Sequence, residues 1–282
     1  MPSPIKILSW NIEHFRTVTT DKAPTVAAVI RSLSPDVFGL YEIEAAPVYD
    51  FMVTHFPDYS LFITEGQQTQ EVLVACRNVF QGIKFEQRHE FRSGSPNLRP
   101  GAFLTFKQGA DFFGFLFLHT DSGSGAVDFG NRNEMFEHTF NLKRKLDKLT
   151  GGPTNFMLLG DLNTMGLKYP SERKSDEIAD TARELAFIDR ESQVKRNGAK
   201  AQMRRLTKPA GTHFSTTYGI SDLDHILAAD HLQFVPQPDP VTGAQFEVKL
   251  GGWRDFPSKP QREAYTATIT DHCYLYCELQ VP

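Results

Sequence analysis

The sequence predicts an α+β fold of four layers, an α/β/β/α sandwich in which two mainly antiparallel sheets pack together and helices flank them. Three observations support this prediction. Strand-like apolar runs outnumber helical stretches, they cluster as neighbours along the chain, and at least three long helical stretches intervene. No repeat, low-complexity linker or clean boundary interrupts the 282 residues, so we expect 1–282 to form one catalytic domain.

The predicted strands are short apolar runs bounded by turn residues. In chain order they lie at residues 5–10, 34–44 (a turn and then a strand ending at Glu42 or Glu44), 71–77, 101–107, 112–120, 155–160, 222–229 and 273–279. The run FFGFLFLHT at 112–120 is almost continuously apolar, which is typical of a strand covered on both faces.

Helices are predicted where apolar residues recur with helical spacing. The stretch 24–33 has this spacing, with Asp21 as a candidate cap and Pro24 in its first turn. The clearest helix is 133–149, where six apolar residues are roughly periodic. Two further helices are expected near 47–56 and 176–187.

Composition and charge exclude some classes of protein. Hydrophobic residues make up 40% and charged residues 23% of the chain, as in soluble globular proteins. The formal net charge of −4 argues against a protein whose main role is non-specific binding to duplex nucleic acid. It does not exclude an enzyme that touches phosphates locally through a metal.

The cysteines and the N-terminus indicate a reducing setting. Cys76, Cys273 and Cys277 form no CxxC pair, and the last two should lie on one strand face as small core residues. No signal pattern and no apolar stretch of about 18 residues occurs, so we expect a cytoplasmic protein without a membrane segment. A signal removed before residue 1 is the alternative, and no protein partner can be inferred.

Polar residues end six of the apolar runs. Taken singly, each is typical of a turn or of a solvated strand end. Together they suggest one polar cluster assembled from distant segments. Its members are Asn11, Glu42, His119, Asp161, Asn163, Asp224, Asp271 and His272.

These runs resemble the motifs of the endonuclease/exonuclease/phosphatase superfamily, which has the deoxyribonuclease-I-like fold. The matching runs, in order, are SWNIE, PDVFGLYEIE, FLHTDSG, LLGDLNT, SDLDHIL and TDH. GDLN alone is moderately specific, whereas the ordered set spans nearly the whole chain and is strongly specific. The resemblance implies a metal-dependent phosphoester hydrolase.

The resemblance also implies a metal site. Glu42 would be the principal ligand, with Asn11 nearby and Asp271 possible as a third. The family commonly has Gln before this Glu, whereas Tyr41 stands here, so Glu44 remains a competing ligand. Mg²⁺ suits oxygen ligands and needs only one or two carboxylates, with Mn²⁺ or another divalent cation as alternatives.

The same resemblance assigns catalytic roles. His272 would be the general base or a phosphate-polarising imidazole, oriented by Asp224. Asp161 would position or deprotonate the attacking water, and Asn163 would hydrogen-bond a phosphate oxygen. His119 would contact the phosphate or help the leaving group.

Further residues are candidates from their positions in the sequence. Arg77 and Arg99 could clamp phosphate, with surface salt bridges as the equal alternative. Arg132 could orient a site carboxylate, and His213 could line the rim. His225 should point to the opposite face from Asp224 and is interpreted as structural.

The stretch KRNGAKAQMRRLTK at 195–208 contains six basic residues and no acid. Lys195, Arg196, Arg204 and Arg205 are its candidate substrate contacts. It lies between the Asp161 and Asp224 motifs, so one interpretation is a funnel for a polyanion that overhangs the site. The alternative is a solvated loop.

Three functions follow from these observations. The first is a divalent-metal-dependent phosphodiesterase, a nuclease acting on DNA or RNA. The second is a phosphatase or phosphodiesterase for small-molecule, lipid or sugar phosphates. The third is an inactive binding module on the same fold, against which the complete set of strand-end residues argues.

Overall fold

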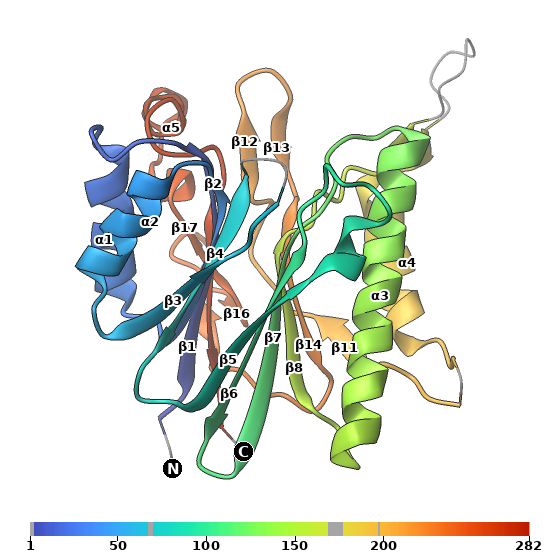
Figure 1. The fold of residues 1–282 in the computed structure, drawn as a ribbon. Helices are drawn as coiled ribbons and strands as arrows, with labels where there is room; N and C mark the ends of the chain where they lie inside the picture. Colours follow the sequence, from blue (N-terminus) through green and yellow to red (C-terminus); the bar gives the residue numbers. More distant parts are fainter. Residues whose placement is uncertain (1–2, 67–69, 169–176, 197, 282) are drawn as a thin grey trace.

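Two six-stranded sheets pack face to face, and helices lie on the outer face of each (Figure 1). The structure is a computed structural model that describes residues 3–66, 70–168, 177–196 and 198–281. The predicted four-layer sandwich is therefore confirmed. Most neighbouring strands are antiparallel, as expected, and each sheet contains one parallel pair.

The first sheet has β1 and β2 at its centre as its parallel pair. Its strands, in spatial order, are β17 (Lys249–Gly251), β18 (Tyr274–Leu279), β1 (Ile5–Phe15), β2 (Val37–Ile43), β4 (Glu71–Arg77) and β3 (Tyr59–Ile63). Helices α1 (Lys22–Leu33) and α2 (Ala46–His55) contribute apolar side chains to the cluster on its outer face.

The second sheet has β7 and β8 as its parallel pair. Its strands, in spatial order, are β11 (Met203–Arg205), β14 (Asp224–Ala229), β8 (Asn155–Asp161), β7 (Asp111–His119), β6 (Gly101–Gln108) and β5 (Gln81–Arg88). Helices α3 (Ala126–Thr150) and α4 (Thr181–Gln193) cover its outer face. The apolar run 112–120 is a central strand with a core on both faces, as its sequence predicts.

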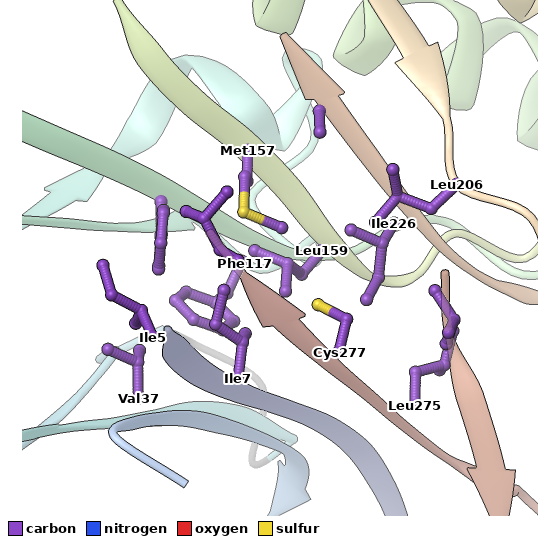
Figure 2. Close-up of a cluster of buried hydrophobic side chains, with 14 of the residues drawn as sticks. Ile5, Ile7, Val37, Phe117, Met157, Leu159, Leu206, Ile226, Leu275 and Cys277 are labelled. Carbon is purple, nitrogen blue, oxygen red and sulfur yellow. The ribbon is translucent and has the colours of Figure 1, made fainter. Parts of the chain in front are cut away.

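The core between the sheets is built by strand alternation. On β1, Ile7 points between the sheets, whereas Leu8 points outward under the helices. Figure 2 shows Ile7, Phe117, Leu159 and Cys277 from both sheets packed together. Cys273 joins Cys277 in this same cluster, so the prediction that both are core residues on one face is confirmed.

The topology brings the functional strand ends to one edge of the sandwich. Strands β1, β2, β7 and β8 end there, while β14 and β18 begin there, as their registers require. Figure 1 shows this edge at the top, opposite the two chain termini. The predicted cluster can therefore assemble from segments far apart in the sequence.

Several boundaries differ from the predictions. Strand β1 continues to Phe15, and α3 begins at Ala126 rather than 133, with the Asp128 carboxylate accepting the N–H of Gly125 at its first turn. Helix α4 begins at Thr181, later than expected, and residues 169–176 lie outside the described part. Strands β3 and β5 were not predicted; both lie at a sheet edge and pair on one side only, and neither has a fully buried residue.

Small elements complete the described chain. They are α5 (Lys259–Thr266), the 3-10 turns His89–Arg92 and Trp253–Asp255, and the strand pairs β9 (Leu167–Lys168) with β10 (Glu177–Ala179), β12 (His213–Ser215) with β13 (Gly219–Ser221), and β15 (Gln237–Pro238) with β16 (Gln245–Phe246). Among the described residues, no helix has the length and apolar character needed to cross a membrane.

Candidate active site

The strand ends at the upper edge have unusual backbone conformations. Glu13, His14, Glu42 and Asn163 have positive φ angles of 45°, 49°, 62° and 43°. The register of β1 and β2 shifts in the same place, as it does between β2 and β4. Such bulges re-aim side chains, and non-glycine residues in this region are often held there for function.

The Asn11 side chain joins carboxylates from both sheets. Its amide nitrogen donates to Glu42 Oε1 at 3.0 Å and to Asp161 Oδ2 at 2.9 Å. The Asn163 N–H donates to the other oxygen of Asp161 at 3.1 Å, and the Asn163 amide donates to the Thr120 carbonyl. Burial and the neighbouring Asp224 raise the pKa of Asp161 to about 7.

His272 is oriented by Asp224, as the sequence predicts. Its Nδ1 lies 2.8 Å from Asp224 Oδ2, and its Nε2 lies 3.8 Å from Asp161 Oδ2 and 3.6 Å from Asp271 Oδ1. Burial alone would lower the pKa of His272, but Asp224, Asp161 and Asp271 outweigh it and raise this pKa well above its usual value. At neutral pH the ring is therefore an imidazolium.

His119 has the opposite charge state. Its Nε2 lies 3.6 Å from Asp161 Oδ2 and 3.8 Å from Glu42 Oε1. Burial, together with Arg99 and His272, lowers the pKa of His119 well below its usual value, so the ring is neutral. Burial lowers the pKa of Arg99, and the charges of Glu42 and Asp161 oppose this shift.

Two carboxyl groups, those of Glu13 and Asp271, influence each other on the β1 side of the site. Burial and the nearby Asp271 raise the pKa of Glu13, and the Lys22 ammonium, which donates to the Glu13 carbonyl at 2.6 Å, opposes this. Asp271 Oδ1 is buried with no hydrogen-bond partner in the described structure. Neighbouring carboxyl groups, one with an unpartnered buried oxygen, fit a hard divalent cation.

Three groups of described side chains bring their ligand atoms within 4.8 Å of one another. They are His213, Asp271 and His272; His14, Glu42 and Glu44; and Asp161, Asp224 and His272. Glu42 and Asp271 share none of these groups, so the predicted ligand set of Glu42, Asn11 and Asp271 remains a prediction.

The two competing glutamates differ in their engagement. Glu44 binds His14 Nδ1 at 2.5 Å and the Arg16 guanidinium. Glu42 accepts hydrogen bonds from the His14 backbone N–H and from the side-chain amides of Asn11 and Gln70. Because Glu44 is already neutralised by an arginine, Glu42 is the better candidate ligand.

Glu13 belongs to the site but was not singled out from the sequence. The signal was present in SWNIE, because Asn11 and Glu13 are two positions apart at a strand end. Lys208 was also missed as an individual residue. Its ammonium donates to the Asp224 carbonyl at 2.5 Å and pairs with Asp222, so it holds the strand end that carries Asp224.

Tyr41, which stands where the family commonly has Gln, is buried between the sheets. Its hydroxyl donates to the Leu159 carbonyl at 3.1 Å and lies 3.0 Å from Ser9 Oγ. It therefore ties β2 to β8 directly behind the site rather than contacting substrate.

Replacing Tyr41 with Phe should lower the free energy of unfolding by about 1 kcal/mol and leave turnover close to normal. Chemical denaturation and rate assays can test this. A large loss of turnover with unchanged stability would contradict this structural role.

Arg77 does not reach the site. Its backbone N–H bonds to the Asp36 carbonyl, its guanidinium lies 3.3 Å from Asp36, and it stacks over Tyr59. Because β4 runs antiparallel to β2, this end of β4 lies at the opposite edge of the sheet from Glu42. The prediction that Arg77 clamps phosphate is wrong, and it forms a salt bridge instead.

The four candidate residues of the basic stretch do not overhang the site. Lys195 and Arg196 follow the end of α4, and Arg196 pairs with Glu137 and Glu191. On β11, Arg204 pairs with Glu247 and Arg205 with Asp189. Arg204 lies opposite Ala228 in the sheet, away from the end of β14 that carries Asp224. The funnel interpretation is therefore wrong for these residues.

Three other candidates have clear positions. Arg132 is fully buried, binds both oxygens of Glu184 and donates to backbone carbonyls at 121, 123 and 166, so it secures the loops after β7 and β8 rather than a site carboxylate. His225 contacts Thr164 away from the site, as expected. His213 lies beside the site, with its Nε2 3.1 Å from Asp271 Oδ2.

Solved structures share this fold over nearly the whole chain. A D. rerio TDP2 humanized by 14 mutations matches with a TM-score of 0.66 and 15% identity, covering 99% of this chain and 100% of that one. D. rerio TDP2 in complex with a single-strand DNA product matches with 0.65 and 14% identity, covering 99% and 100%. A mannosyl-6-phosphatase from Bacteroides thetaiotaomicron matches with 0.59 and 16% identity, covering 98% and 100%.

These identities are low, so the likeness to solved structures shows the fold alone. Comparison with curated proteins found no significant match. The model of the endonuclease/exonuclease/phosphatase family matches residues 8–272. The matched span includes every strand end of the site described above, and the chain belongs to the endonuclease/exonuclease/phosphatase family.

Proposed function

We propose that this protein is a divalent-metal-dependent phosphodiester hydrolase that acts on nucleic acid. The observation that carries the proposal is the position of Asp161. It is bonded to Asn11, which also bonds Glu42, and it faces the imidazole of the His272–Asp224 pair. A base, a candidate metal ligand and a cationic imidazole thus converge on one small volume.

The protonation states of Asp161 and His272 suit them to different catalytic roles. Because the pKa of Asp161 is about 7, a substantial fraction of its carboxyl is ionised at neutral pH and can take a proton from an attacking water. The raised pKa of His272 keeps its ring protonated, so it stabilises charge on the phosphate oxygens. Pairs of groups whose pKa values are pushed apart are a common basis for acid and base roles.

The metal ligands would be Glu42 with Asn11 and Asp271. An all-oxygen donor set of this kind suits Mg²⁺, and Mn²⁺ can substitute. When bound, such a cation supplies charge neutralisation on the phosphate. Asn163 and Arg99 would contact phosphate oxygens, and the neutral His119 would hydrogen-bond the phosphate or the leaving oxygen.

Nucleic acid is favoured as substrate by the complex of D. rerio TDP2 with a single-strand DNA product, which has the same fold. A sugar phosphatase is the second candidate, because the Bacteroides thetaiotaomicron mannosyl-6-phosphatase also shares this fold. The basic residues at 196, 204 and 205 are paired with acids away from the site. Substrate binding should therefore rely on local contacts to phosphate rather than on a wide basic surface.

Hydrolysis of single-stranded DNA, RNA, plasmid, a bis-aryl phosphate and mannose 6-phosphate tests the proposal. With Mg²⁺ we expect cleavage of a nucleic acid, abolished by EDTA. Glu42→Ala should raise the Mg²⁺ concentration needed for half-maximal rate, whereas the matched variant Glu44→Ala should change it little.

Two outcomes would contradict the proposal. Hydrolysis of only the sugar monoester would favour the phosphatase. A dominant effect of Glu44→Ala would move the metal ligand by two positions.

A further inference from the structure

We propose that His213, Asp271 and His272 form a second metal site, one that contains imidazole nitrogens and binds Zn²⁺ or Co²⁺ in preference to Mg²⁺. The nitrogens and oxygens that these residues offer lie within 4.8 Å of one another. His213 Nε2 is 3.1 Å from Asp271 Oδ2, and His272 Nε2 is 3.6 Å from Asp271 Oδ1. One carboxylate thus lies between two imidazole nitrogens.

Both histidines are held in the orientation of metal ligands. A ligating histidine almost always bonds through its other ring nitrogen to a carboxylate or another polar group, which fixes the ring. His272 Nδ1 bonds to Asp224 Oδ2 at 2.8 Å, and His213 Nδ1 bonds to Ser221 Oγ at 2.9 Å. Each ring therefore directs Nε2 at Asp271.

The backbone also fixes this arrangement. His213 at the base of the β12–β13 hairpin forms an isolated bridge with His272. The N–H of Phe214 donates to the Asp271 carbonyl at 2.9 Å, and the N–H of Cys273 donates to the Thr212 carbonyl at 2.7 Å. The three ligands are thus attached to one rigid piece of the structure.

The site has an unused ligand atom and an open side. Asp271 Oδ1 is buried and has no hydrogen-bond partner in the described structure. The side chains of His213 and Asp271 are 20% and 27% exposed, so water or substrate can complete the coordination. Three protein ligands with one open position is the usual form of a zinc site that is not purely structural.

The donor types determine which cation is preferred. Imidazole suits Zn²⁺, Co²⁺ and Ni²⁺, whereas Mg²⁺ takes oxygen ligands. The proposed hydrolytic metal site is all oxygen, so the two sites differ in chemistry although Asp271 would be a ligand in both. Resting on the proposed function, we infer that an ion at this second site inhibits hydrolysis, because it occupies His272 Nε2, the atom that lies 3.8 Å from Asp161 Oδ2.

Co²⁺ titration of the full chain in excess Mg²⁺ tests the site without requiring any activity. We expect one equivalent of Co²⁺ to produce the intense visible absorption of a four-coordinate site, and Zn²⁺ to abolish it. His213→Gln should remove the absorption while keeping a hydrogen bond to Asp271. His231→Gln is the matched control, because His231 bonds Asn155 at the far end of β8, and it should leave the absorption unchanged.

A second variant keeps the test decisive if His213→Gln fails to fold, as circular dichroism would reveal. Ser221→Ala retains all three ligands but removes the partner of His213 Nδ1, and should weaken Co²⁺ binding about 10–100-fold. Unchanged Co²⁺ absorption in His213→Gln, unchanged affinity in Ser221→Ala, or loss of the wild-type absorption on adding Mg²⁺ would each overturn the proposal.

Zn²⁺ inhibition of Mg²⁺-dependent hydrolysis provides the functional readout. We expect inhibition in the wild type and relief in His213→Gln. If the protein hydrolyses no phosphoester but binds Co²⁺ as described, the metal site stands and the hydrolytic function fails. Relief of inhibition by His231→Gln instead would place the inhibitory ion elsewhere.

Discussion

Replacing His272 with alanine is expected to reduce turnover by about 10²–10⁴-fold, the range for a lost acid–base or charge-stabilising group. The His272 ring is the cationic centre of the site, because Asp224 holds its Nδ1 at 2.8 Å and its Nε2 faces Asp161 and Asp271. Alanine removes this charge and leaves Asp224 and Asp161 close together without a cation between them. Single-turnover assays at saturating Mg²⁺ would measure the loss.

The matched control for His272→Ala is His138→Ala. His138 lies on α3, 3.5 Å from Glu134, and no described contact links it to the site. We expect near-normal turnover from this control. Asp224→Asn should give a smaller loss than His272→Ala, because it disturbs the orientation of the ring without removing it. Near-normal turnover of His272→Ala would remove the residue from the mechanism.

The fold was predictable because its apolar runs are long and its core strands are buried on both faces. The run ending at His119 and the run ending at Asp161 are both central strands with apolar residues facing two cores. The edge strands β3 and β5 were not predicted, since every residue of β3 is partly buried and β5 alternates mainly exposed with partly buried residues, so neither has a fully buried residue. Helix α3 begins before the periodic stretch, where its first turn is fixed by the Asp128 cap, a local contact that apolar periodicity does not show.

The site was predictable where a polar residue ends a strand whose direction is known. Asp161, Asp224 and His272 meet because β8 ends and β14 and β18 begin at one edge. The same reasoning gave a wrong position for Arg77, because β4 runs antiparallel to β2 and its last residue lies at the opposite edge of the sheet. The sequence shows that a strand ends in arginine but not in which direction the strand runs.

The funnel interpretation of the basic stretch was wrong for a different reason. In the sequence its residues form a run of like charges. In the fold they pair with acids from other segments, namely Glu137, Asp189 and Glu247. Ion pairing between segments that are far apart in sequence cannot be deduced from local charge counts. Lys208 lies at the end of this stretch and does reach the site, by the backbone carbonyl of Asp224.

Asp161→Asn is expected to lower turnover by about 10²–10⁴-fold and to remove a pH dependence. Burial and the nearby Asp224 raise the pKa of Asp161 to about 7 from 3.8. The catalytic form is the ionised carboxylate, so kcat/KM of the wild type should fall as the pH drops through about 7. Bound cations favour the carboxylate and should shift this limb to lower pH, and the variant should lack it. A wild-type profile without an acidic limb, or an acidic limb that persists in Asp161→Asn, would contradict the assignment of Asp161 as base.

The same raised pKa predicts an effect on the stability of the metal-free protein. The folded state holds the Asp161 proton more tightly than the unfolded chain, so this group contributes stability that is present below about pH 4 and lost as the pH rises through about 7. Denaturant unfolding in EDTA should show this contribution in the wild type and not in Asp161→Asn.

Because Asp161 Oδ2 lies 3.8 Å from His272 Nε2, the two residues should act as a unit in catalysis. The Asp161→Asn/His272→Ala double variant should therefore lose little more turnover than either single variant, whereas additive losses would show that the two residues act independently.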